Sequence, residues 1–230
     1  MALERLPRRQ TRCKVAPVSG RVVLAVAGNI GSGKTTLTRR LAQRLALKGL
    51  FEPLDENPYM SDFYGDMPRW ALPVQLRFLV ARVRQVRDAI GAGVSAVQDR
   101  TCWEDAEIFA ANLHARGEMD QRDCDTYRMV ASEVLAELPP PDLLVYLRRE
   151  APGCHAQIAK RGREYEASIP LPYLEDLGAR YDAFYEGWSR SLKLLVRAED
   201  NEFLERDDDL EALVRRIEAA LPQPTLPFGD

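Results

Sequence analysis

A glycine-rich run that ends in a lysine and two threonines carries the clearest chemical signal in the chain. It follows an apolar stretch at 22–27, precedes a helical pattern, and consists of Gly28, Asn29, Ile30, Gly31, Ser32, Gly33, Lys34, Thr35 and Thr36. Such a loop can aim successive backbone N–H groups at phosphates, with the positive end of the next helix behind them. Lys34 would contact the β- and γ-phosphates, and the Thr35 hydroxyl would bind Mg²⁺. The run predicts binding of a nucleoside triphosphate, but it does not identify the phosphate acceptor.

Charged residues that follow short apolar runs are candidates for the rest of a phosphoryl-transfer site. Asp99 follows the run 94–98 and could hold Mg²⁺, or it could cap the next helix instead. Arg100 beside it could stabilise the negative charge that develops during transfer. Glu52 follows the short run 50–51 and could accept the proton of a substrate hydroxyl, although a solvated surface role fits the residue alone.

The segment Lys-Arg-Gly-Arg at 160–163 ends a helical pattern and precedes a polar stretch. Arginines in this position can close over a transferring phosphoryl group as part of a mobile lid. A solvated helix end is the alternative interpretation of the same residues.

Apolar runs alternate with helical patterns along the chain. Strands are expected at about 22–27, 50–51, 94–98, 143–147 and 192–197, and helices at about 34–48, 73–90, 104–116, 120–138, 152–161, 172–190 and 207–221. Gly49 is expected to cap the first helix, and Pro73 to open the second. The apolar stripe of that second helix is expected to be Leu76, Leu79, Val80, Val83, Val86 and Ile90. This order predicts an α/β fold, with a parallel sheet of about five strands, helices on both faces, and ligands at the carboxyl ends of the strands.

Composition favours one domain at 20–221, followed by a tail at 222–230. The basic extension at 1–19 is predicted to be disordered, and a nucleic-acid or membrane role is the alternative for that segment. The 32 basic and 35 acidic residues are interleaved and leave a formal net charge of −3, so no nucleic-acid partner is expected.

No apolar run approaches the ~20 residues of a membrane span, and no membrane partner is expected. The four cysteines lack a C-x-x-C spacing and no signal-peptide pattern is present, which favours reduced thiols in the cytoplasm.

Six separated signatures in register resemble those of the deoxynucleoside kinase family. Besides the glycine-rich loop they are Glu52-Pro53 with Glu56-Asn57-Pro58-Tyr59, Phe63-Tyr64 with Arg69-Trp70, Gln75, Asp99-Arg100-Thr101 with Glu104-Asp105, and Arg161-Gly162-Arg163 with Glu166. The resemblance covers about residues 21–205 and is closest to the short bacterial deoxyadenosine and deoxyguanosine kinases. It implies a P-loop kinase fold with an arginine-rich lid, and transfer of phosphate from ATP, with Mg²⁺ held by Thr35 and Asp99, to the 5′-hydroxyl of a deoxynucleoside. It also implies a homodimer formed through the helices at about 73–90 and 120–138.

The same resemblance implies a role for each matching residue. Glu52 would be the general base on the 5′-hydroxyl, and Arg100 would hold that hydroxyl and the base in place. The sugar 3′-hydroxyl would contact Tyr64 and Glu166, and the nucleobase would contact Gln75 and Phe109. On the ATP side, the phosphates would contact Arg161 and Arg163, and the adenine would contact the loop that includes Asn201 and Phe203.

Arg82 and Asp105 bear on the choice of nucleobase. Family members that accept deoxycytidine and purine deoxynucleosides tend to carry an arginine and an aspartate at these positions, whereas members that prefer thymidine tend to carry smaller or apolar residues. If a base that does not match were bound, the buried charged groups of Arg82 and Asp105 would lack hydrogen-bond partners, which costs binding free energy. Deoxyadenosine is therefore favoured, with deoxyguanosine and deoxycytidine next, and a purely structural ion pair is the alternative.

Two other functions fit parts of the pattern. A nucleoside monophosphate kinase of the thymidylate type shares the loop, the Asp-Arg pair and a lid, but Glu52 would repel an incoming phosphate. A regulatory protein that hydrolyses ATP slowly and uses the lid as a switch would show turnover indifferent to nucleosides.

Overall fold

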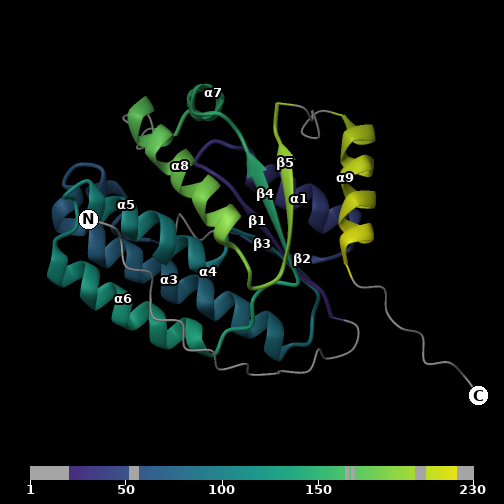
Figure 1. Cartoon of the computed structure of the whole chain (residues 1–230), viewed down its shortest axis with the longest axis horizontal. Coiled ribbons are helices and arrows are strands. Elements are labelled where there is room, and N and C mark those ends of the chain that lie inside the picture. Colours follow the sequence, from purple (N-terminus) through teal and green to yellow (C-terminus); the bar gives the residue numbers. More distant parts are fainter. Residues whose placement is uncertain (1–20, 52–56, 164–165, 167–168, 200–205, 222–230) are drawn as a thin grey trace, which may run out of the picture.

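A single parallel sheet forms the centre of the computed structural model, which describes residues 21–51, 57–163, 166, 169–199 and 206–221. Its five strands have the order β2-β3-β1-β4-β5 (Figure 1). Their bounds are Val23–Ala27 (β1), Lys48–Leu50 (β2), Ala96–Asp99 (β3), Leu143–Arg148 (β4) and Leu192–Arg197 (β5). The described strands agree with the expected α/β class and parallel sheet, and β5 has the expected bounds.

The central strands are buried on both faces because each packs side chains alternately into two separate cores. Leu24 and Val26 of β1 belong to one core, whereas Ala25 and Ala27 belong to the other. Strand β4 alternates in the same way. Near-continuous apolar runs are what a parallel sheet between two helical layers requires.

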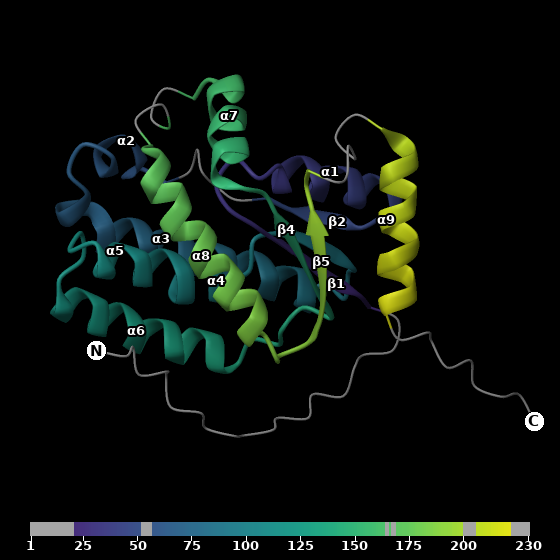
Figure 2. The same ribbon diagram turned by 45° about the horizontal axis from the view of Figure 1, so that its top comes forward.

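Helices cover both faces of the sheet (Figures 1 and 2). One face is covered by α1 (Lys34–Arg44) and α9 (Asp207–Ala220). The other carries the larger core and is covered by α3 (Met67–Gly91), α6 (Gln121–Ala136) and α8 (Leu171–Gly187). The short helix α2 (Met60–Phe63) precedes α3, and α7 (Ala151–Arg161) follows β4 at the carboxyl edge of the sheet.

Strand β3 leads into a helical segment that changes type along its length. It consists of α4 (Cys102–Glu104), the π-helical segment η2 (Asp105–Ala110) and α5 (Ala111–Ala115). π-Helical turns within α-helices are uncommon and often occur at functional sites. Two of the residues expected to contact the nucleobase, Asp105 and Phe109, lie in η2.

Two expectations about helices α1 and α3 are wrong, and a third holds in part. Helix α1 ends at Arg44, a turn with a positive φ of 52° at Ala46 follows, and Gly49 lies inside β2. Helix α3 begins at Met67 because Asp66 caps it, accepting a hydrogen bond of 3.3 Å from the Arg69 N–H, so Pro73 lies inside the helix. Leu79, Val83 and Val86 of the expected apolar stripe are buried, whereas Val80 is 50% exposed. The buried face of α3 also includes Ala71, Val74 and Phe78.

Within the described ranges, no helix is both long enough and apolar enough to cross a membrane. The predicted extension at 1–19 and the tail at 222–230 lie outside the described residues.

Candidate active site

The glycine-rich loop joins β1 to α1 and needs glycine at two positions. Gly31 and Gly33 have positive φ angles of 77° and 99°, a region that favours glycine. A β-carbon on Gly31 would also overlap the backbone carbonyl oxygen of Cys154 in α7. The loop is therefore packed directly against the helix that leads to the predicted lid.

Two side chains of the loop and one arginine from outside it hold this loop in place. Lys34 is 6% exposed and donates to the Asn29 carbonyl over 3.0 Å. The Asn29 amide donates in turn to the carbonyl of Leu174 in α8 over 2.8 Å. Arg149, the residue after β4, donates to the Ser32 carbonyl over 3.1 Å. The sequence analysis missed this contact because nothing local marks this arginine. The loop is thus held both by its own side chains and by contacts with α8 and Arg149.

Thr35 and Asp99 bring the loop and the end of β3 together. The Thr35 hydroxyl donates a hydrogen bond of 2.6 Å to Oδ2 of Asp99. The other carboxylate oxygen, Oδ1, is buried and has no hydrogen-bond partner. A carboxylate with an unused buried oxygen beside a hydroxyl is a donor set that suits Mg²⁺.

The alternative role of Asp99 as a helix cap is wrong, because Thr101 caps α4. The Thr101 hydroxyl accepts from the Glu104 N–H over 3.2 Å, and the Glu104 carboxylate accepts from the Thr101 N–H over 2.6 Å. This reciprocal pair is a capping box. It leaves the Asp99 side chain directed to Thr35.

Arg100 is buried beside the loop in a conformation that is unusual for a residue other than glycine. Its φ is 77° and its side chain is 5% exposed. Nη1 donates to the Gly28 carbonyl over 3.3 Å and also to the Tyr181 hydroxyl. The guanidinium carbon lies 4.5 Å from the centre of the Phe109 ring. A strained backbone of this kind is often retained at functional sites.

Arg82 and Asp105 form a buried ion pair between α3 and η2. Arg82 Nε lies 2.9 Å from Asp105 Oδ2, and the two side chains are 2% and 4% exposed. Nη1 of Arg82 also donates to the Asp99 carbonyl over 2.8 Å. The pair therefore connects the expected nucleobase side of the site to the expected metal side.

A cavity opens at the carboxyl edge of the sheet and brings most of the expected residues together. The expected residues that line it are Ile30, Gly31, Lys34, Thr35, Tyr64, Gln75, Arg100, Asp105, Phe109, Arg161, Arg163 and Glu166. Five further residues line the cavity, and the sequence analysis gave them no role: Met60, Phe63, Val74, Phe78 and Tyr173. Phe63 was part of a matching signature but had no assigned role. Phe78 lies one helical turn after Gln75 on the same face of α3, which could have indicated it.

The predicted lid residues meet over this cavity. Helix α7 ends at Arg161, and Gly162 follows with a positive φ of 70°. Arg161 Nε donates to Glu166 Oε2 over 3.0 Å, and Arg163 Nη1 donates to Glu166 Oε1 over 3.4 Å. Glu166, expected on the sugar side, thus contacts both arginines expected on the phosphate side.

Three expected site residues, Glu52, Asn201 and Phe203, lie outside the described residues. The chain just before Glu52 is held by Gln85 of α3, whose amide donates to the Phe51 carbonyl over 3.0 Å.

Comparison with known proteins identifies the family to which this site belongs. The family model for deoxynucleoside kinase matches residues 24–222. The chain belongs to the deoxynucleoside kinase family. This kinase is 36% identical over 202 residues to the deoxyadenosine/deoxycytidine kinase of Bacillus subtilis, covering 86% of this chain and 93% of the relative. It is 33% identical to the deoxyadenosine kinase of Dictyostelium discoideum, with 85% and 78% covered.

Solved structures agree with the assignment. The deoxyadenosine kinase from M. mycoides with bound dATP superposes with a TM-score of 0.76 at 29% identity, covering 86% of this kinase and all of that chain. The chain is therefore a P-loop kinase that transfers phosphate from a nucleotide donor to a nucleoside.

Two buried residues of this kinase contact Arg100 although no role was expected for them. The Tyr181 hydroxyl of α8 donates to Glu104 Oε1 over 2.9 Å, and that oxygen lies 3.8 Å from Arg100 Nη1. Tyr181 and Glu104 are both fully buried. Burial raises the pKa of the Glu104 carboxyl, and the Arg100 guanidinium and the Tyr181 hydrogen bond oppose that rise.

Proposed function

We propose that this kinase transfers the γ-phosphoryl group of ATP to the 5′-hydroxyl of deoxyadenosine, with deoxyguanosine and deoxycytidine as the next-best substrates. The observation that carries the base preference is the buried ion pair of Arg82 with Asp105, of which Asp105 lines the cavity. The pair offers charged hydrogen-bond donors and acceptors to the ring nitrogens and exocyclic groups of a purine or of cytosine. Thymine does not present its groups in a matching arrangement. The named substrates of the relatives, which include deoxyadenosine, deoxycytidine and deoxyguanosine, support this choice.

On the donor side, the loop amides and Lys34 would hold the β- and γ-phosphates. Thr35 and Asp99 would hold Mg²⁺, and the charge that develops on the phosphates would be neutralised in part by the bound ion. Arg161 and Arg163 would exchange their contacts with Glu166 for contacts with the transferring phosphate. Asn201 and Phe203 would pack on the adenine of ATP.

On the acceptor side, Glu52 would take the proton of the 5′-hydroxyl as that oxygen attacks the γ-phosphorus. Arg100 would hold the same hydroxyl in line with the phosphate. Tyr64 and Glu166 would bind the 3′-hydroxyl. The nucleobase would pair with Gln75 and stack on Phe109, with Asp105 beside its edge.

We further propose that the kinase is a homodimer formed through α3 and α6, and that it serves nucleoside salvage in the cytoplasm. Two of the exposed large hydrophobic side chains in the described residues lie on these helices, with Val80 50% and Met129 62% exposed. Apolar side chains on neighbouring helices would be covered by a second copy. Light scattering should give twice the chain mass, and a monomeric mass at micromolar concentration would contradict the proposal.

The substrate proposal is tested by measuring kcat/KM for deoxyadenosine, deoxyguanosine, deoxycytidine, thymidine and thymidine monophosphate, each with ATP and Mg²⁺. The expected order places deoxyadenosine first and thymidine last. Turnover with only the monophosphate would favour the thymidylate-type kinase. ATP hydrolysis indifferent to every acceptor would favour the regulatory switch.

A further inference from the structure

Arg100 is held by two residues that do not line the cavity, Tyr181 and Glu104. We propose that Tyr181 and Glu104 are positioning residues for phosphoryl transfer, because together they fix the Arg100 guanidinium at the acceptor end of the cavity. The proposal rests on the role proposed above for Arg100.

The direction of each hydrogen bond in this group is determined by chemistry. An arginine side chain only donates, and an ionised carboxylate only accepts. The Tyr181 hydroxyl lies between Arg100 Nη1 and Glu104 Oε1, so it must accept from the arginine and donate to the carboxylate. This direction gives each of the three groups a partner of the right kind. The arrangement therefore selects one orientation of the hydroxyl and one position of Nη1.

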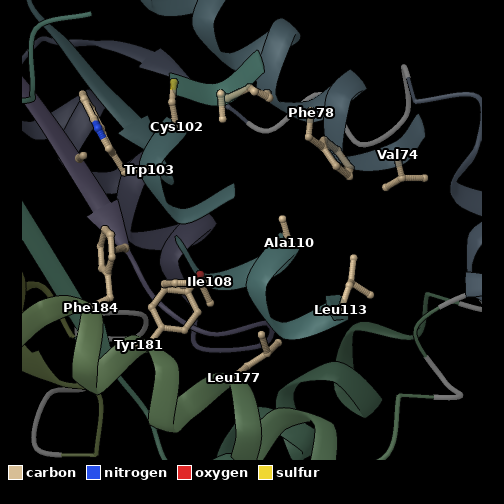
Figure 3. Packing of buried hydrophobic residues seen from close by; sticks show 14 of the residues in the cluster. Val74, Phe78, Cys102, Trp103, Ile108, Ala110, Leu113, Leu177, Tyr181 and Phe184 are labelled. Atoms are coloured by element: carbon tan, nitrogen blue, oxygen red, sulfur yellow. The ribbon is translucent and has the colours of Figure 1, made fainter. Parts of the chain in front are cut away.

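Aromatic packing holds the Tyr181 ring while its hydroxyl makes these bonds. The ring stacks on Tyr146 of β4, with 5.9 Å between centroids and 11° between planes. It meets Phe109 of η2 edge-on at 6.3 Å. Figure 3 shows the ring reaching from α8 toward Ile108, also in η2. The position of the hydroxyl is thus determined by three elements of the fold.

Glu104 accepts the hydrogen bond of the Tyr181 hydroxyl and supplies the negative charge opposite Arg100. Its Oε2 accepts from the Thr101 N–H over 2.6 Å, which ties the carboxylate to the first turn after β3. A guanidinium that is 5% exposed needs an opposite charge close by, and Glu104 Oε1 lies 3.8 Å away. The Arg100 backbone is fixed as well, since its N–H donates to the Val26 carbonyl over 3.0 Å. Together these contacts leave the guanidinium little freedom.

Removing only the Tyr181 hydroxyl tests the proposal. Tyr181→Phe keeps the ring packing but removes the acceptor for Arg100 and the donor to Glu104. Small misplacement of a group at the reacting atoms can cost up to about 100-fold in rate. We expect kcat for deoxyadenosine to fall roughly 10- to 100-fold, while the nucleoside Kd changes less than about threefold and binding remains stoichiometric.

Tyr185→Phe is the matched control. Tyr185 lies one turn further along α8 and its ring also contacts Tyr146, with 5.4 Å between centroids. This variant should keep kcat within about twofold of the parent. Glu104→Gln is the second variant, because a glutamine oxygen can still accept from the Thr101 N–H while the negative charge is lost. It should lower kcat by at least about tenfold.

The decisive comparison repeats Tyr181→Phe in an Arg100→Lys background. If Tyr181 acts through Arg100, the second substitution should lower kcat by less than about twofold, because residues that act as a unit are not additive. The same fold loss in both backgrounds would overturn the proposal, as would a wild-type kcat in Tyr181→Phe. A wild-type kcat in Arg100→Lys would instead contradict the role proposed for Arg100 itself.

Discussion

Thr35 and Asp99 share a hydrogen bond of 2.6 Å that joins the first turn of α1 to the last residue of β3. The bond uses Oδ2 of the carboxylate and leaves Oδ1 buried without a hydrogen-bond partner. Buried polar atoms normally have a partner, so an unused one next to Thr35, which lines the cavity, indicates a place for a ligand. The pair is therefore the strongest local support for the proposed Mg²⁺ site.

Asp99→Asn should weaken this site because the neutral amide attracts a divalent cation less than the carboxylate does. We expect the free Mg²⁺ concentration that gives half-maximal rate to rise roughly tenfold or more. Asp142→Asn is the control: its carboxylate accepts from the Val23 N–H over 2.7 Å, at the opposite ends of the strands. An unchanged Mg²⁺ dependence in Asp99→Asn would contradict the assignment.

Replacing Arg82 by Met together with Asp105 by Ala should shift the base preference toward thymidine. The double variant removes the charged groups that thymine cannot match and leaves an apolar wall. The check is the ratio of kcat/KM for deoxyadenosine to that for thymidine, which should fall. An unchanged ranking of nucleosides would mean that the pair is only structural.

The same two residues should be strongly non-additive in stability. Asp105→Ala alone leaves a buried guanidinium without its carboxylate, which costs about 3–5 kcal/mol of unfolding free energy. The double variant should lose less unfolding free energy than the two single variants lose in sum, because neither charged side chain then stays buried without the other. Denaturant unfolding of all four proteins gives the interaction energy, and simple additivity would argue against a direct ion pair.

Gly31→Ala should damage the phosphate loop more than its backbone angle alone requires. Gly117 has a similar φ, 75°, but open space around it, so Gly117→Ala should cost only about 1–2 kcal/mol of stability. Gly31→Ala carries the same strain and also the overlap with the Cys154 carbonyl. We expect a larger loss of stability and weaker ATP binding, measured by denaturation and calorimetry. An equal loss of stability in the two variants would contradict the inference that the Cys154 carbonyl leaves no room for a β-carbon at Gly31.

Glu52→Gln should separate chemistry from binding. Glutamine keeps the size of the side chain but accepts a proton poorly, so kcat should fall by at least about 100-fold. Nucleoside binding, measured at equilibrium without turnover, should stay close to that of the parent. Retained activity would exclude Glu52 as the base.

The sequence predicted the loop and the position of Asp99 because both depend on local patterns. A glycine-rich run between an apolar strand and a helix is recognisable without tertiary information, and so is an acid at the end of a strand. The start of α3 was missed because Pro73 is also a plausible opening residue. The cap by Asp66 became evident only in the structure.

Residues that act through distant contacts could not be found in the same way. Tyr173 and Tyr181 look like core residues of an amphipathic helix, and only the packing of α8 brings them to the site. Arg149 reaches the loop from a position 117 residues away in the chain. For Arg82 and Asp105 the resemblance suggested a shared role, and their 2.9 Å contact depends on how α3 meets η2.

Product analysis after incubation with ATP, Mg²⁺ and deoxyadenosine tests the central claim most directly. The account predicts ADP and 5′-deoxyadenosine monophosphate in equal amounts, with the new phosphate on the 5′-oxygen and far less product from thymidine. ADP released with inorganic phosphate, and no phosphorylated nucleoside from any deoxynucleoside, would contradict it.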